Sequence, residues 1–298
     1  MSNQWIPWSN RNEEFAPVFG LHKYEMFYPT KIEAFLKDSC ELMVLIGTDS
    51  SGPIYRKIEK FAQGSMMEKM QWMLHPKMNK KYNYLDRHSG QIDMKKSAKI
   101  QQSEPTQLYV WGFQNKATGQ AYVTYWFFYV ENFMPSRTTD DVEIADVLDN
   151  RPGTWWTHQG DWEALSIHFK DFEANNPTEV IFEQHNKSEA ISWDAVEKEK
   201  GRICAFTALG SHATYNKTQR KPVFLFYIDI SSPDVLYYPK SIADNTVNSY
   251  YLEELDPRHG HLWLGFKGRW GRSGGELTPS PQGPMMKKKK HLRFLAAL

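Results

Sequence analysis

Two aromatic-rich segments that flank a short loop constrain the fold of this chain more than any other feature of its sequence. Residues 108–113 and 121–130 combine Tyr, Trp, Phe and Val, and the loop between them, 115–119, ends in a glycine. Such residues favour strands, and a short glycine-containing loop between two strands predicts a β-hairpin. Further strands are predicted at 162–170, 178–184, 203–208, 222–230 and 261–267. Short strands separated by Gly, Pro and Asn are typical of an antiparallel β-sandwich, so we predict a mainly β protein of this class.

Helical signals are confined to the N-terminal third, which we expect to pack on the sandwich. Thr30-Lys-Ile-Glu33 has the spacing of a capping box, and the apolar residues that follow predict a short helix at 30–39. Methionines at helical spacing predict helix within 55–75, as core filler or as a binding groove. We predict one domain over 1–298, with an arm and helices at 1–105, the β-sandwich core at 106–270 and a C-terminal tail at 271–298.

Charge and hydropathy argue against several classes of protein. The 36 Lys and Arg against 35 Asp and Glu give a net charge of +1, and the basic stretches lack the aromatic platform of nucleic-acid binders. No apolar run approaches the roughly 20 residues of a transmembrane helix. The N-terminus lacks the pattern of a signal peptide and the two cysteines, Cys40 and Cys204, fit reduced thiols, so we expect a cytoplasmic protein. Four lysines at 287–290 are interpreted as a solvated tail, with an acidic partner or a membrane surface as alternatives.

The segment from His158 to Glu163 is the strongest candidate for a functional site. It contains His158, Asp161 and Glu163, and a predicted strand follows it. Side chains alternate along a strand, so Asp161 and Glu163 point the same way, while Trp162 points into the opposite layer. Two carboxylates on one face repel each other unless a cation, a proton or hydrogen bonds offset the charge.

Two further polar clusters follow predicted strands. Glu183-Gln-His185 ends one apolar strand, and Gly210-Ser-His212 follows another. If these strands are neighbours, His185 and His212 converge on Asp161 and Glu163. Three roles stay open for them: a cation site for calcium, magnesium or manganese, with zinc as a weaker candidate; acid/base catalysis by histidine beside a carboxylate; or hydrogen bonds that hold strand ends. Ser211 lacks the glycine pattern of a nucleophile elbow and is interpreted as a turn residue.

Several ordered motifs carry a resemblance to a known family. The chain resembles the vacuolar protein sorting-associated protein 62 family, whose signature is similar to Gly160-Asp-Trp-Glu163. The other similar motifs follow in the family's order: 15–22, 25–29, 125–132, Gln184-His185, 210–213, 262–271 and 282–284.

A more distant similarity, to the necrosis- and ethylene-inducing-like proteins, implies a metal at the end of a β-sandwich. In that family a His, an Asp and a Glu help to hold a divalent cation, and His158, Asp161 and Glu163 match them. An upstream acidic ligand would fall near Asp149. The second histidine of the family motif is replaced by Gly160, so the similarity does not imply cytolysis.

Function is therefore expected to depend on a divalent-metal site formed by His158, Asp161, Glu163 and Asp149, with His185 and His212 as candidate proton-transfer residues. An enzyme of this kind would carry out metal-assisted hydrolysis or a lyase or cyclase reaction on a small molecule. The alternatives are a non-catalytic module that binds a glycan or a lipid headgroup in membrane traffic, and a cytolysin-like toxin. The sequence does not decide whether the protein is an enzyme, nor its oligomeric state.

Overall fold

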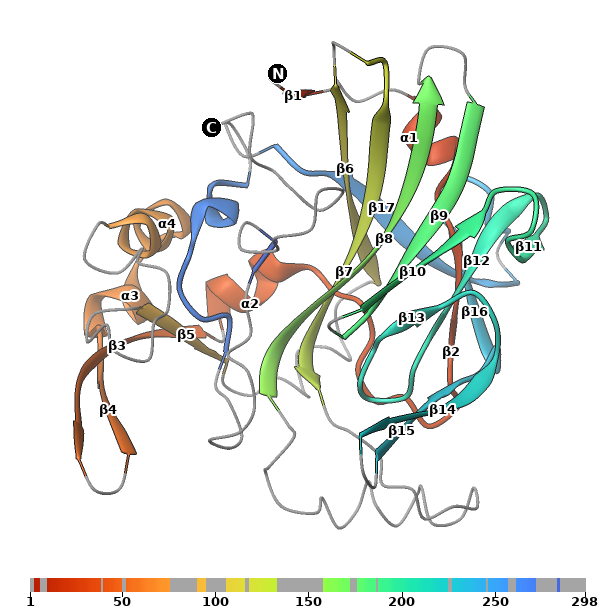
Figure 1. The fold of residues 1–298 in the computed structure, drawn as a ribbon. Coiled ribbons are helices and arrows are strands. Elements are labelled where there is room, and N and C mark those ends of the chain that lie inside the picture. Colours follow the sequence, from red (N-terminus) through yellow and green to blue (C-terminus); the bar gives the residue numbers. More distant parts are fainter. Residues whose placement is uncertain are drawn as a thin grey trace.

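One large curled sheet dominates the computed structural model of the chain. The structure describes residues 3–5, 10–38, 40–49, 52–75, 90–94, 106–115, 118–132, 158–171, 176–185, 187–224, 227–244, 246–256, 261–271 and 283–284. Within these residues, twelve strands join in the order β10-β9-β8-β7-β6-β17-β16-β2-β12-β11, with β1 on β6 and β13 on β12 (Figure 1). The strands are β1 (Asn3–Trp5), β2 (Val18–Leu21), β6 (Gln107–Asn115), β7 (Ala121–Asn132), β8 (His158–Asp171), β9 (Asn176–Gln184), β10 (Lys187–Ser192), β11 (Lys198–Glu199), β12 (Arg202–Thr207), β13 (Thr214–Tyr215), β16 (Val235–Pro239) and β17 (Asn248–Glu254).

The expected mainly β class is confirmed, but the sheet is mixed and not strictly antiparallel. The predicted hairpin is present as β6 and β7, and β8 and β9 extend it in antiparallel pairs. Three pairs are parallel: β2 with β12, β16 with β17, and β17 with β6. A sequence pattern identifies a strand but not the strand with which it pairs, and two of these parallel pairs, β2 with β12 and β17 with β6, join segments that are far apart in the chain. The segment 1–105, for which an arm and helices were predicted, contains the strand β2, which lies between β16 and β12.

The curl brings the two halves of the sheet face to face, which gives the structure the packing of a sandwich. Phe19 on β2 makes an edge contact with Phe127 on β7, although three strands separate them in the sheet. Near the closing edge, the Thr214 hydroxyl on β13 donates to the carbonyl oxygens of Ala164 on β8 and Glu183 on β9, at 3.1 and 3.0 Å. The curl therefore places the loop after β12 beside the beginning of β8 and the end of β9.

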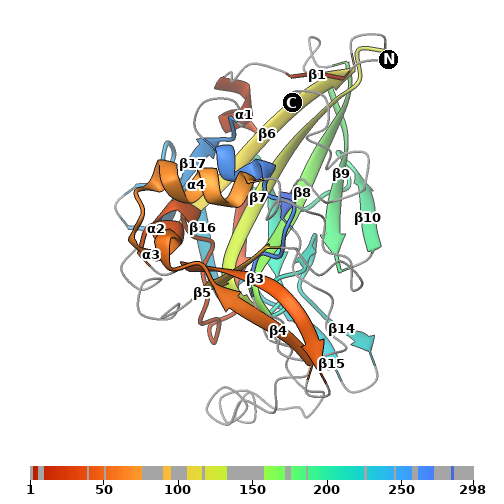
Figure 2. The ribbon, with the colours of Figure 1, turned by 90° about the vertical axis from the view of Figure 1, so that its left-hand side faces the viewer.

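Three helices, α2, α3 and α4, and the small sheet of β3, β4 and β5 lie on one side of the large sheet (Figures 1 and 2). The expected helix at 30–39 is present as α2, and the helical segment within 55–75 is two helices that meet at Gly64 and Ser65. Ser65 and Glu68 form a capping box at the second of these. The remaining elements are α1 (Asn10–Glu14), α2 (Ile32–Asp38), α3 (Glu59–Gln63), α4 (Met66–Leu74), a 3-10 helix η1 (Leu262–Gly265), a sheet of β3 (Cys40–Asp49), β4 (Gly52–Lys57) and β5 (Gly90–Met94), and a hairpin of β14 (Gln219–Phe224) and β15 (Tyr227–Ser231).

Two predicted strands take other forms. The segment 222–230 is divided between β14 and β15, which pair with each other in antiparallel orientation, and 261–267 contains η1. Trp263 in η1 and Trp270, which follows η1 in the chain, both pack against Trp162. Trp162 is 1% exposed and also contacts Tyr109 and Phe128. Its predicted orientation into the core is thus confirmed.

Candidate functional site

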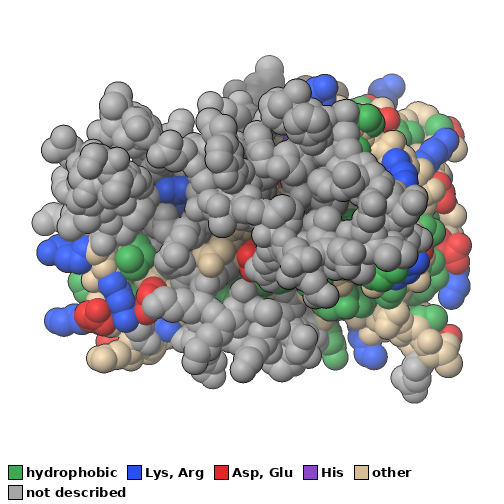
Figure 3. Space-filling view, turned by 90° about the horizontal axis from the view of Figure 1, so that it is seen from below, with side chains coloured by type: hydrophobic (Ala, Val, Ile, Leu, Met, Phe, Trp, Pro, Cys, Tyr) green, Lys and Arg blue, Asp and Glu red, His purple; other side chains and the backbone are tan. Residues whose placement is uncertain are grey.

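The predicted polar residues gather at the end of the large sheet where β7 ends and β8 begins. Asp161 and Glu163 lie on β8 and are buried, at 6% and 9% exposure. The loop after β12 brings His212 to this end, and the turn after β9 brings His185. Figure 3 looks onto the lower end of the molecule, and the described charged side chains visible there are of both signs. His212 contacts Asp161, and the charges of Asp161 and Glu163 act on His185, so these four residues converge at this end of the sheet.

His212 is held between two carboxylates. Its Nδ1 lies 3.0 Å from Asp161 Oδ2, and its Nε2 lies 3.5 Å from Glu25 Oε1. The imidazole stacks on Tyr129 with ring centroids 3.7 Å apart. Burial lowers the pKa of His212, but the charges of Glu25 and Asp161 and their hydrogen bonds outweigh it and raise the pKa to about 9. The fully buried ring is thus an imidazolium near neutral pH.

The backbone of the turn formed by Gly210, Ser211 and His212 has two positive φ angles. Gly210 and His212 have φ angles of 67° and 60°, in the left-handed region that suits glycine and strains a histidine. The Gly210 amide donates to Glu25 Oε2 at 2.6 Å, so one carboxylate holds both the turn and the imidazole. Ser211 donates to Asp229 Oδ1 at 2.5 Å, in agreement with its predicted structural role.

His185 forms a second histidine–carboxylate pair. Its Nε2 lies 2.7 Å from Asp229 Oδ2, and the His185 side chain is 25% exposed whereas that of Asp229 is 1% exposed. Asp229 also accepts hydrogen bonds from Ser211 and Tyr215. Burial lowers the pKa of His185, but the hydrogen bond and charge of Asp229 outweigh burial, so the pKa is raised. The arrangement is that of an accessible imidazole oriented by a buried carboxylate.

The backbone of His185 is also unusual. It follows β9 in the short connection to β10 and has a φ of 54°. A two-residue hairpin connection requires positive φ, for which Asn or Gly is the usual choice. A histidine there costs on the order of 1 kcal/mol or more, and residues under such strain cluster at functional sites.

The predicted metal ligands are only partly gathered. His158 Nε2 lies 4.0 Å from Asp161 Oδ1, and Asp161 Oδ2 is directed at His212. Among the described residues, the potential ligand atoms of His158, Asp161 and Glu163 do not all lie within 4.8 Å of one another, whereas those of another group of three residues do. Asp149 lies outside the described residues. The metal assignment thus stays a prediction.

The more compact trio is Glu33, Glu253 and His261, which the sequence analysis missed. His261 Nδ1 accepts a hydrogen bond from the Asp256 amide at 2.9 Å, so Nε2 carries the proton and donates to Glu253 Oε1 at 3.0 Å. A metal-bound histidine normally donates through its other ring nitrogen, which this geometry opposes. We therefore interpret the trio as a polar connection between α2, β17 and η1.

Sequence reasoning also missed Glu25 and Asp229, the partners of the two histidines. Asp229 lies between Ile228 and Ile230 on β15, and a lone acidic residue in an apolar strand was the available signal. Glu25 lies in an irregular segment after β2 and gave no comparable signal.

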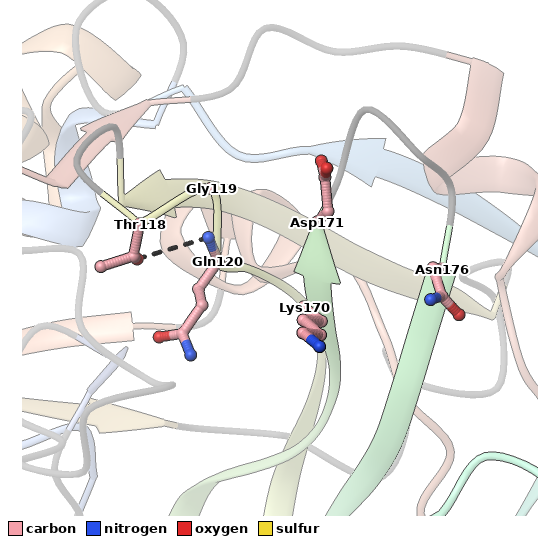
Figure 4. A pocket seen from close by; sticks show the side chains of 6 residues that line it. All are labelled: Thr118, Gly119, Gln120, Lys170, Asp171 and Asn176. Atoms are coloured by element: carbon pink, nitrogen blue, oxygen red, sulfur yellow. Dashed lines mark hydrogen bonds between the residues drawn. The ribbon is translucent and has the colours of Figure 1, made fainter.

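An open hollow lies at the opposite end of β8 (Figure 4). It is lined by loop and strand-end residues, including Gly119, Lys170 and Asn176. Lys170 and Asp171 lie at the end of β8, whereas Asp161 lies near its beginning, so the hollow is separate from the histidine cluster. None of the six lining residues is buried, so the hollow lacks the enclosed side chains that are typical of a ligand-binding site.

No helix in the described part of the chain is long and apolar enough to cross a membrane.

No curated protein and no solved structure matches the chain. The distant similarity to the necrosis- and ethylene-inducing-like proteins stays a prediction. The family model described as vacuolar protein sorting-associated protein 62 matches residues 11–222, which include Glu25, both strands of the hairpin, Asp161 and both site histidines. The chain belongs to the vacuolar protein sorting-associated protein 62 family.

Proposed function

We propose that this protein is a metal-assisted hydrolase or lyase that acts on a small molecule at the end of the sheet where β8 begins. The observation that supports the proposal is the His185–Asp229 pair, an accessible imidazole fixed by a buried carboxylate. It lies near Asp161 and Glu163, whose charges contribute to the raised pKa of His185. Acid/base groups and potential cation ligands thus occupy one end of the sheet.

In this proposal His185 transfers the proton. Its Nε2 is engaged by Asp229, which leaves Nδ1 as the nitrogen that can contact a substrate. The raised pKa increases the share of His185 that carries the proton, so His185 serves first as the acid that protonates the leaving group. In a hydrolysis, a water oxygen bonds to the electrophilic atom, the bond to the leaving group breaks, and the Nδ1 proton passes to that group. The neutral Nδ1 then accepts the proton that the attacking water loses, which restores the imidazolium. Asp229 keeps the ring oriented throughout.

His158, Asp161 and Glu163 would hold the divalent cation, which when bound would polarise an oxygen atom of the substrate or of water. An imidazole and two carboxylates form a donor set that suits calcium, magnesium or manganese. The 4.0 Å between His158 Nε2 and Asp161 Oδ1 is compatible with one shared ion, because calcium ligands at roughly 2.3–2.6 Å can lie up to about 5 Å apart.

Proton transfer by His212 stays a prediction. Because His212 is fully buried, we assign to it the positioning of Asp161, which it contacts at 3.0 Å. Groups that hold a metal ligand in this way commonly change metal affinity by about 10- to 100-fold when they are removed.

Elemental analysis of the protein purified without chelator tests the cation. We expect about one calcium, magnesium or manganese ion per chain in the wild type, a marked loss in Asp161→Asn and Glu163→Gln, and no change in the exposed control Asp194→Asn. If neither the wild type nor Asp161→Asn holds metal after soaking with each cation, the metal part of the proposal is wrong.

Turnover of a panel of chromogenic esters, phosphoesters and glycosides tests the chemistry. We expect His185→Gln to lower the rate by about 100-fold or more, and the exposed control His75→Gln to leave it unchanged. Stoichiometric metal with no turnover of any compound would contradict catalysis. That result would favour the alternative of a binding module for a glycan or a lipid headgroup.

A further inference from the structure

Gln184, the residue before His185, has a side chain fixed in one orientation. It is 5% exposed. Its Nε2 donates to Glu189 Oε2 at 2.7 Å, and its Oε1 accepts a hydrogen bond from Lys221 Nζ at 2.7 Å. The opposite amide orientation would turn an NH2 group toward the ammonium and an oxygen toward the carboxylate. Gln184 thus presents an acceptor to Lys221 and keeps its donor turned to Glu189.

Lys221, on β14, is held at the same end of the sheet as His185. Its Nζ lies 5.3 Å from the ring centroid of Tyr215. The hydroxyl of Tyr215 donates to Asp229, the carboxylate that orients His185. Lys221 and His185 are therefore connected through two side chains, with Gln184 as a second link along the backbone.

Among the residues that the structure describes, no ion pair neutralises the charge of Lys221: no carboxylate oxygen lies within 4.0 Å of its Nζ, and its hydrogen-bond partner is a neutral amide. An ammonium has three N–H donors, and Gln184 takes one of them. Ordering a lysine side chain costs conformational entropy, which a single hydrogen bond to a neutral acceptor barely offsets. A fixed, half-buried ammonium with spare donors is suited to an anion.

We infer that Lys221 and Gln184 form an anion-binding subsite beside His185, and that the substrate carries an oxyanion group there. Lys221 supplies the charge and two N–H donors, and Gln184 positions the ammonium. Phosphate, sulfate and carboxylate groups share this acceptor chemistry. The identification of the anion as part of the substrate rests on the proposed function, whereas the binding of an anion does not.

Isothermal titration with inorganic phosphate, sulfate and acetate at constant ionic strength tests the subsite. The protein is first freed of metal with a chelator, so that no bound cation can hold the anion. We expect saturable binding of at least one probe, and the preferred probe distinguishes tetrahedral oxyanions from carboxylates. Lys221→Met should weaken that binding about tenfold or more, and Lys221→Arg should keep it within about threefold.

Two further variants complete the test. Lys217→Met removes an exposed lysine from the same part of the chain and should leave binding unchanged. Gln184→Glu should weaken binding, because a carboxylate would neutralise Lys221 directly. Each variant is compared with the wild type by its urea midpoint, so that a folding defect is recognised.

The absence of saturable binding in the wild type would overturn the inference, as would equal losses in Lys221→Met and Lys217→Met. Binding that requires metal and disappears in Asp161→Asn, but not in Lys221→Met, would also overturn it, since a cation would then hold the anion. Anion binding that persists in His185→Gln without turnover of any substrate would support the subsite while the proposed enzyme function fails.

Discussion

Replacement of Asp229 by Asn tests the buried hydrogen-bond network that orients His185. The substitution keeps the size of the side chain and removes its charge. Asp229 is 1% exposed and accepts hydrogen bonds from His185, Ser211 and Tyr215. If the Asn oxygen faces His185 and Tyr215, its NH2 group faces Ser211, whose hydroxyl can rotate to accept. The Ser211 hydroxyl then loses the acceptor for its own proton, and the hydrogen bonds from His185 and Tyr215 lose the charge of their acceptor.

The magnitude follows from these three hydrogen bonds. A hydrogen bond to a charged group contributes about 1.5–3 kcal/mol to stability, and a neutral one contributes about 0.5–1.5 kcal/mol. Each of the three bonds therefore loses about 1 kcal/mol, and the free energy of unfolding of the variant should fall by about 3 kcal/mol. The pKa of His185 is raised in the folded protein, so its ion pair with Asp229 contributes fully below the unfolded value near 6.5. That contribution is lost as the pH rises through the raised pKa. The stability difference should therefore be larger at about pH 6 than at about pH 9.

Urea unfolding of the wild type and Asp229→Asn at both pH values measures this difference, and NMR titration of His185 measures its pKa. We expect the pKa of His185 to fall in the variant. Asp194→Asn, at an exposed position, should change the free energy of unfolding by less than about 0.5 kcal/mol. Identical midpoints for wild type and Asp229→Asn at both pH values would refute the reasoning, because the buried carboxylate would then contribute nothing to the network.

Three further predictions concern the core and the backbone. Trp162→Ala should lower the free energy of unfolding by about 3–5 kcal/mol in urea melts, because its side chain is 1% exposed among other aromatic rings. Gly271→Ala should lower the free energy of unfolding by more than about 2 kcal/mol, because φ is 122° and a Cβ would overlap the Gln159 carbonyl. Gly119→Ala, with φ of 72° and open space around it, should lower it by about 1 kcal/mol. Equal losses in the two variants would contradict the packing argument. Burial, followed by the charges of neighbouring glutamates, raises the pKa of Cys204 to about 12, so iodoacetamide should label its peptide only in urea, as read by mass spectrometry.

The candidate site was predictable where it depends on local pattern. Asp161 and Trp162 lie on opposite faces of β8, as the two-residue period of a strand requires, and His185 and His212 each follow a strand as expected. Their partners were not predictable in this way. The contact between His212 and Asp161 joins residues 51 positions apart, and the contact between His185 and Asp229 joins residues 44 apart. Such pairs depend on which strands become neighbours.

The sequence by itself determined the mainly β class, the β6–β7 hairpin and the helix α2, because alternation, turn residues and capping spacing act within a few residues. Only the tertiary structure decided that β2 inserts between β16 and β12, that three strand pairs are parallel, and that the segment at 261–267 contains a 3-10 helix. These outcomes depend on the curl of the sheet, which brings the loop after β12 onto the beginning of β8 and so pairs His212 with Asp161 and Glu25. The physical reason is that strand propensity is a local property, whereas the pairing of strands minimises the exposed apolar surface of the whole chain.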